Sequence, residues 1–172
     1  HARNKNLRAA LEGFACFVGF EPSWEGDLVI VGPPDRDTAD LRRLASDLEI
    51  NPRIRWISSL DQAGLEKQIR SSFCLLSSSL MEGFDYPLLE AQNFGLPTLA
   101  SDIPVHAELH AQNAILFRLG DAGSSLAYEL RRLARDPACW KHLSEAGLAN
   151  ARKFTLERQV KGIIKLLKDV RL

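Results

Sequence analysis

Long apolar segments are missing from this sequence. Its longest apolar runs, such as FACFV, extend over about five residues, whereas a membrane-spanning helix needs about 20. The first residues, HARNKNLRAALEG, also lack the apolar core and the small-residue cleavage site of a secretory signal. We therefore expect no membrane-spanning segment, and a chain that starts with His rather than Met is expected to be a piece of a longer protein.

Cysteine is scarce, with only three in 172 residues. Cys16, Cys74 and Cys139 are far apart and odd in number, and stretches such as FACFV and FCLL surround them with apolar residues. Disulfide frameworks and zinc sites need paired or clustered cysteines, so this pattern predicts buried free thiols. It also predicts a reducing compartment, and hence a cytoplasmic location.

An excess of charge of either sign is also lacking. Lys and Arg together number 22, and Asp and Glu together number 22. No overall field would attract nucleic acid or an anionic membrane surface, so any specificity for an anion must be local. The length of 172 residues predicts a single domain with a substantial core.

Short β-branched runs alternate with amphipathic helical segments from Leu28 onward, as is typical of an α/β fold. We expect a Rossmann-like, mostly parallel sheet with helices on both faces. A helix from Leu7 to about Val18 precedes the first visible strand, and each crossover joins two strands, so a further strand is expected before residue 1. The five strands predicted from the sequence are 28–32, 54–58, 73–78, 97–101 and 114–118.

Three helices are predicted in series at the end of the chain: one around 126–134, one from Pro137 to about Arg152, and one after a Thr155 cap. The last would have an apolar face (Leu156, Val160, Ile163, Ile164, Leu167) and a basic face (Arg158, Lys161, Lys165, Lys168). Such a helix can contact a membrane surface peripherally or dock on an acidic partner, or its basic face can simply be solvated.

The stretch EGFDYPLLE, residues 82–90, has the features of an anion-binding helix start. We place the helix N-cap near Asp85 and expect the helix to run to about Asn93, with unpaired N–H groups at its start and Gly83 allowing a ligand close to the backbone. Glu90 would lie about 7.5 Å along the helix and Glu82 just before it. The two carboxylates could then bind hydroxyls on either side of a phosphate. A nucleotide sugar has this arrangement, with ribose on one side of its phosphates and a hexose on the other.

The longer segment SSSLMEGFDYPLLEAQNFGLPTLASDIPVHAEL closely resembles the donor-site segment of the group 1, or family 4, retaining glycosyltransferases, which have the two-domain GT-B fold. The matching positions are Ser79, Glu82, Gly83, Phe84, Pro87, Leu89, Glu90, Ala91, Gly95, Pro97, Ser101, Asp102, Pro104 and Glu108. The likeness covers essentially the whole chain but only the second domain of that fold, so residues 1–172 would be its nucleotide-sugar-binding domain.

The resemblance implies a role for each site residue. Glu90 would hold the ribose hydroxyls, and Glu82 would contact the transferred sugar and stabilise positive charge at its anomeric carbon. Backbone N–H groups of Gly83, Phe84, Asp85 and Tyr86, with the Lys5 ammonium, would bind the diphosphate. The base would lie near Ser58 to Leu60. No metal or other cofactor is expected, because the chain has no aspartate cluster of the kind that holds Mg²⁺ against a diphosphate.

The partners implied are a nucleotide-sugar donor and an acceptor-binding N-terminal domain that this chain does not contain. The chain alone is therefore expected to transfer no sugar. Two alternatives share the fold: an epimerase or phosphorylase, and a non-catalytic domain for interaction or regulation.

Asp85 and Tyr86 depart from the family pattern, which has glycine and commonly leucine there. A carboxylate about 5 Å from a diphosphate charge costs about 3 kcal/mol at an effective dielectric constant of 20, unless it turns to solvent or binds a hydroxyl. We expect His106, His110 and the serines of the loop to be packing or surface residues, with no nucleophile among them.

Overall fold

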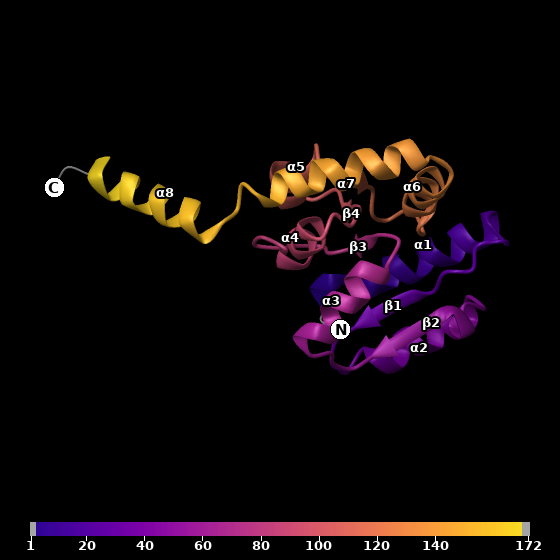
Figure 1. The fold of residues 1–172 in the computed structure, drawn as a ribbon. Coiled ribbons are helices and arrows are strands. Elements are labelled where there is room, and N and C mark those ends of the chain that lie inside the picture. The colour runs from indigo at the N-terminus through magenta and orange to yellow at the C-terminus, as the bar shows by residue number, and fades with distance from the viewer. Residues whose placement is uncertain (1–2, 170–172) are drawn as a thin grey trace.

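The computed structural model describes residues 3–169 of the chain. Helices and strands alternate along it (Figure 1). In chain order they are η1 (Arg3–Lys5), α1 (Leu7–Phe20), β1 (Leu28–Val31), α2 (Thr38–Asp47), η2 (Asn51–Arg53), β2 (Ile54–Ile57), α3 (Gln62–Ser71), β3 (Leu75–Ser77), α4 (Tyr86–Asn93), β4 (Thr98–Ser101), α5 (Pro104–His110), β5 (Ile115–Phe117), α6 (Ser124–Arg135), α7 (Pro137–Ala151) and α8 (Leu156–Asp169).

All five predicted strands are present, and every pair is parallel. β1 pairs with β2, and β3, β4 and β5 form a second sheet in that order. Among the described residues, β1 and β3 do not pair with each other, so the sheet is in two parts. The strand expected before residue 1 lies outside the described residues and stays a prediction.

Helices cover both faces, as the sequence predicts. Successive residues of a strand point to opposite faces. In β3, Leu76 packs against a large cluster that includes residues of α1, α2 and α6, whereas Leu75 packs against a smaller cluster that includes residues of α3 and α4. The fold is therefore an α/β domain with a core on each side of the sheet.

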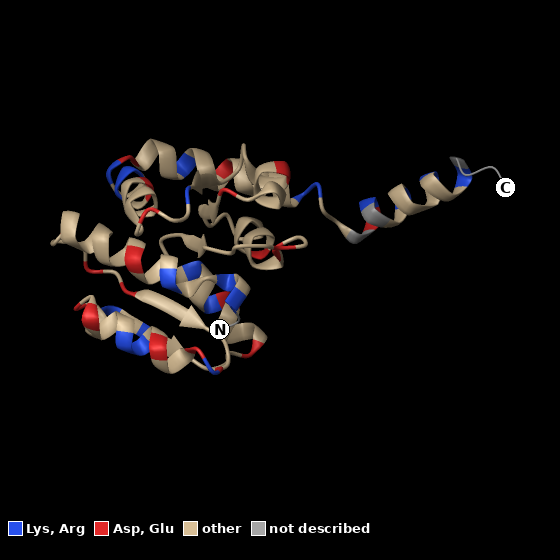
Figure 2. Cartoon of the chain, turned by 180° about the vertical axis from the view of Figure 1, so that it is seen from behind, with Lys and Arg blue, Asp and Glu red and all other residues tan. Residues whose placement is uncertain are grey.

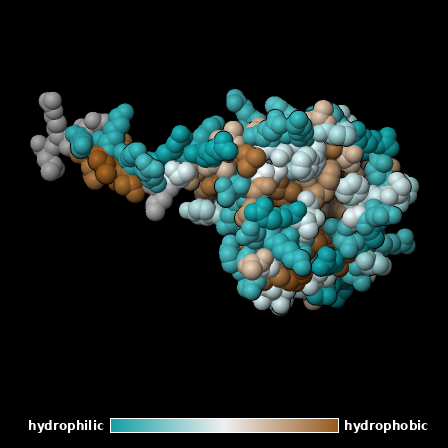
Figure 3. Space-filling view, viewed as in Figure 1, coloured by the Kyte–Doolittle hydropathy of each residue, from teal (hydrophilic) through white to brown (hydrophobic). Residues whose placement is uncertain are grey.

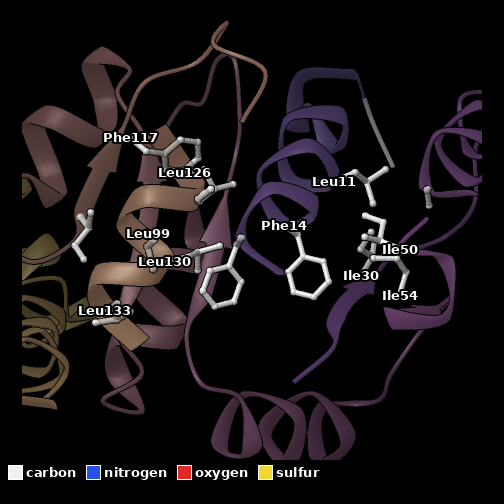
Figure 4. Packing of buried hydrophobic residues seen from close by; sticks show 14 of the residues in the cluster. Leu11, Phe14, Ile30, Ile50, Ile54, Leu99, Phe117, Leu126, Leu130 and Leu133 are labelled. Carbon is white, nitrogen blue, oxygen red and sulfur yellow. The ribbon is translucent and has the colours of Figure 1, made fainter. Parts of the chain in front are cut away.

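Helix α1 connects the two parts of the sheet through the larger core. Figure 4 shows Phe14 in the middle of this cluster, with Ile30 and Ile54 on one side and Leu99 and Leu126 on the other. Because one continuous cluster reaches both sheets, packing on α1 fixes their relative position without hydrogen bonds between β1 and β3.

Several predicted helix ends are confirmed. The Asp61 carboxylate accepts a hydrogen bond of 2.7 Å from the Gly64 N–H at the start of α3, and the Thr155 hydroxyl accepts one of 3.3 Å from the Arg158 N–H. Gly95 follows α4 with a φ of 70°, a left-handed conformation that glycine adopts without steric cost.

The prediction of buried free thiols is only partly right. Cys16, Cys74 and Cys139 are free, but each is partly rather than fully buried. Burial of the Cys74 thiol raises its pKa to about 12, so this cysteine is not a nucleophile at neutral pH.

Helix α8 extends away from the rest of the described structure (Figure 1). Its predicted apolar face is open to solvent, with Val160, Ile163, Ile164 and Leu167 between 44% and 70% exposed, and Figure 3 shows this apolar surface. Peripheral membrane contact by this helix stays a prediction. Within residues 3–169, no helix is long and apolar enough to cross a membrane. Basic and acidic residues are interspersed along the described chain (Figure 2).

A buried polar cluster ties α4 to α5 and α7. His110 Nδ1 lies 3.3 Å from the Gln92 side-chain nitrogen and 3.4 Å from that of Asn150, and the Asn150 amide also donates to the Gln92 carbonyl oxygen at 2.9 Å. Since both neighbours of Nδ1 are donors, His110 is neutral and carries its proton on Nε2. Burial lowers the pKa of His110, and the nearby positive charge of His106 lowers it further.

His110 should therefore make stability depend on pH. Its pKa is lower in the folded than in the unfolded chain, so the unfolded chain binds the proton more readily and stability falls as the pH drops below about 6.5. We expect His110→Gln to reduce this loss in urea unfolding between about pH 7 and about pH 5. His142→Gln, at an exposed position of α7, should keep the wild-type dependence. The same pH dependence in His110→Gln and wild type would contradict the assignment.

Candidate functional site

Two segments far apart in sequence meet beside the carboxyl end of β3. One is the turn before α1, residues 3–6, and the other is the loop from Ser78 to Asp85 that leads into α4. The Leu80 N–H donates to the Asn4 carbonyl at 2.7 Å. The Ser78 hydroxyl lies 2.9 Å from the Lys5 carbonyl and 3.0 Å from the Asn6 carbonyl. The carboxyl ends of parallel strands are the usual ligand-binding edge of α/β folds.

Lys5 lies at the centre of this junction. Its ammonium is 2.7 Å from a Glu82 carboxylate oxygen and 3.4 Å from Asp85 Oδ1. Burial on its own would lower the pKa of Lys5, but the hydrogen bonds and charges of Glu82 and Asp85 outweigh burial and raise that pKa above its usual range. The structure thus brings together three residues predicted to be in the site, and keeps the lysine positively charged.

Glu82 is held in place by more than the lysine. The Ser79 hydroxyl donates to Glu82 Oε1 at 2.8 Å, and the Glu82 side chain is only 12% exposed. The Ser101 hydroxyl, at the end of β4, in turn donates to the Ser79 carbonyl. The serines are therefore loop-lining residues with hydrogen-bond partners, as predicted.

The turn before α4 has unused hydrogen-bond donors. Within residues 3–169, the backbone N–H groups of Gly83, Phe84, Asp85 and Tyr86 donate to no protein acceptor. A Cβ atom at Gly83 would have no neighbour within 4 Å, so the backbone is open to a ligand there. Free N–H groups at the positive end of a helix dipole can bind an anion.

Asp85 is the N-cap residue of α4, as predicted, but its side chain points neither to solvent nor toward an incoming anion. The residue is 4% exposed and adopts a left-handed backbone with a φ of 63°. Its carboxylate makes no capping hydrogen bond and instead accepts from the Ser77 hydroxyl and lies 3.0 Å from His106 Nε2. Repulsion between Asp85 and a diphosphate is therefore weaker than the sequence predicted, because the charge is directed inward and paired.

His106 is the contact that the sequence prediction missed. We expected a packing or surface position for it, and the ring is fully buried in α5. Ile103, His106 and His110 recur at intervals of three and four residues, so they share the inward face of the short helix. Two histidines on an apolar face were a signal that a buried polar partner was needed.

The remaining predicted site residues lie around the start of α4. The Phe84 ring lies at a tilt to the Tyr86 ring, with centroids 4.9 Å apart, and meets the Phe154 ring edge-on at 5.4 Å, so it links the turn to the segment before α8. Tyr86 is 68% exposed. Glu90 is exposed on α4, and no described side chain pairs with it, which leaves its carboxylate open to a ligand.

No group of three or more His, Cys, Asp or Glu side chains in the described part of the chain is arranged to hold a metal ion. The expectation of a site that needs no metal or other cofactor stays a prediction.

Comparison with known proteins gives a consistent picture. The family described as "Glycosyl transferases group 1" matches residues 1–136. The glycosyltransferase 1 domain-containing protein 1 of Xenopus tropicalis is 29% identical over 129 residues, which cover 74% of this chain and 35% of that protein. The serotype-specific mannosyltransferase WbdA of Escherichia coli is 33% identical over 115 residues, 64% of this chain and 14% of that protein.

A solved structure with the same fold is that of HepE from Anabaena in complex with UDP and glucose. It superimposes with a TM-score of 0.83 and 17% identity, covering 99% of this chain and 46% of that one. The chain thus spans about a third of the length of the frog protein, a smaller part of the bacterial mannosyltransferase, and about half of this structure.

Proposed function

The chain belongs to the group 1 glycosyl transferases, which have the GT-B fold, and we propose that residues 1–172 are the part of such an enzyme that binds the nucleotide-diphospho-sugar donor. The reaction is transfer of a hexosyl group with retention of its anomeric configuration. The acceptor binds to another part of the complete protein, so the chain alone transfers no sugar. We propose that the enzyme acts in the cytoplasm, because its three cysteines are free thiols, as is usual in a reducing compartment.

One observation carries this proposal: Lys5 contacts Glu82 and Asp85 at the open start of α4. This geometry puts a lysine of raised pKa beside four backbone N–H groups that have no acceptor among the described residues. A diphosphate fits such a site, because it can accept several hydrogen bonds and its charge is stabilised by the ammonium and the helix dipole.

The two glutamates then divide the donor between them. Glu90, exposed on α4, binds the ribose hydroxyls. Glu82, held by Ser79 and Lys5, contacts the transferred sugar and stabilises the positive charge that develops at its anomeric carbon. When the bond from that carbon to the diphosphate breaks, Lys5 and the N–H groups stabilise the leaving diphosphate.

We expect the chain to bind at least one donor in a panel of UDP-, GDP- and ADP-sugars, measured by calorimetry. The UDP and glucose in the HepE structure support the choice of UDP-glucose as the first probe. Glu90→Ala removes the acceptor of two hydroxyl hydrogen bonds to a charged group, and we expect affinity to fall by about 10- to 100-fold. This result would identify a donor site that uses α4.

Glu145→Ala is the matched control, because Glu145 is also an exposed glutamate on a helix but lies on α7. It should bind the donor with wild-type affinity. If no nucleotide sugar binds, or if Glu90→Ala and Glu145→Ala behave alike, the proposal is wrong, and a non-catalytic interaction domain becomes the better reading of the fold.

A further inference from the structure

A buried acid–base pair lies beneath the turn from Glu82 to Asp85. His106 Nε2 is 3.0 Å from Asp85 Oδ2, and the two side chains are 0% and 1% exposed. The Ser77 hydroxyl donates to the same carboxylate oxygen, and the Lys5 ammonium lies 3.4 Å from the other one. Three elements, β3, α5 and the turn before α1, therefore hold one side chain at the N-cap of α4.

The hydrogen-bond partners of His106 determine where its protons are. Nδ1 lies 2.8 Å from the Ser101 carbonyl oxygen, which can only accept, so Nδ1 carries a proton. Nε2 faces a carboxylate oxygen, which accepts unless it is itself protonated. One proton must therefore lie between Nε2 and Asp85 Oδ2, because without it a lone pair would face a buried negative charge.

The surrounding charges indicate that this proton belongs to the ring. Burial alone would raise the pKa of Asp85, but the hydrogen bonds of His106 and Ser77 and the charges of Lys5 and His106 outweigh burial and lower it. Lys5 contacts Asp85, and Glu82 contacts Lys5, so these are the charged groups around the pair. The neutral ring of His110 has its centroid 6.4 Å from that of His106. Two positive groups, Lys5 and His106, then balance two negative ones, Glu82 and Asp85.

We propose that His106 is a positioning residue of the donor site: its protonated ring holds Asp85 inward, and so keeps the turn from Glu82 to Tyr86 in its open, anion-binding shape. Aspartate can adopt a left-handed conformation when its short side chain forms local hydrogen bonds, but the Asp85 carboxylate makes no capping bond and is held by Ser77 and His106 instead. The pair also keeps the Asp85 charge away from the diphosphate, a consequence that rests on the proposed donor site.

Two variants separate the hydrogen bond from the charge. Asp85→Asn keeps the shape of the side chain, and its amide can donate to a neutral His106 while its oxygen accepts from Lys5. His106→Leu removes the partner altogether and leaves the Asp85 carboxylate without its buried cation. The positioning role predicts that Asp85→Asn is tolerated and that His106→Leu is not.

The first measurements need no ligand. Nitrogen-15 NMR at about pH 7 should show both ring nitrogens of His106 protonated in wild type and only Nδ1 protonated in Asp85→Asn. Backbone order parameters of Gly83, Phe84 and Tyr86 should remain near about 0.85 in wild type and Asp85→Asn, and fall below about 0.6 in His106→Leu. A neutral His106 ring in wild type, or a turn that stays rigid in His106→Leu, would overturn the proposal.

Binding of UDP-glucose then tests the consequence. We expect His106→Leu to weaken affinity by about tenfold or more, and Asp85→Asn, which keeps hydrogen bonds to His106 and Lys5, to weaken it less than His106→Leu does. Equal affinities of wild type and His106→Leu would refute the positioning role. If the NMR results hold and no nucleotide sugar binds, the donor site alone is wrong and the pair stands.

Discussion

Glu82→Gln should reduce turnover of the donor by about 10²- to 10³-fold in the complete protein. The amide keeps the size of the side chain and can still accept from Ser79, but it lacks the charge that stabilises a positive anomeric carbon. Because this interaction is strongest in the transition state, kcat should fall much more than KM changes. Release of nucleotide from UDP-glucose by hydrolysis measures the effect without knowledge of the acceptor, since water then takes the acceptor's place.

Glu145→Gln on α7 controls for the loss of a carboxylate and should retain full activity. Glu90→Ala provides a second comparison, because it should weaken donor binding and so raise KM. Should Glu82→Gln retain activity within about twofold, Glu82 does not act on the sugar, and its contact with Lys5 only maintains the site.

The order of strands and helices was readable from the sequence because local patterns determine it. Runs such as LVIVG and IRWIS are short and rich in β-branched and aromatic residues, which favours strands, and the five predicted strands all formed. Their ends shifted by one or two residues, as in β3, which is Leu75–Ser77 rather than 73–78. Strand ends depend on pairing with a neighbour, which a single segment does not encode. The segment around HAEL was expected only as a short connection and is the helix α5.

The sequence named candidate site residues, whose roles stay predictions, but it did not reveal how their side chains contact one another. The helix start at 82–90 pointed to Glu82 and Gly83, the family resemblance pointed to Lys5, and the structure brings Lys5 to Glu82. The direction of the Asp85 side chain depends on His106, 21 residues later, and this contact exists only after β4 and α5 have packed. The Asp85 charge, which the sequence suggested would oppose a diphosphate, is therefore part of a buried pair with His106.

Replacing Gly123 with alanine should destabilise the domain by at least about 3 kcal/mol. Gly123 precedes α6 with a φ of 83°, and a Cβ atom there would overlap the backbone of Glu12 and Gly13 in α1. A flexible side chain could move aside, but the backbone of a packed helix cannot. Since domains of this kind are stable by about 5–15 kcal/mol, urea unfolding should show a large fall in midpoint.

Gly120→Ala separates the two causes of the lost stability, which are backbone strain and overlap with α1. Gly120 has nearly the same φ, 84°, but a Cβ atom there has no neighbour within 4 Å, so alanine should cost only the backbone strain of about 1 kcal/mol. The difference between the variants measures how closely α1 must approach α6. Equal losses of stability would mean that the two helices can separate.

Because α1 also packs on both parts of the sheet and begins two residues after Lys5, Gly123→Ala should weaken donor binding as well as the fold, whereas Gly120→Ala should leave binding unchanged.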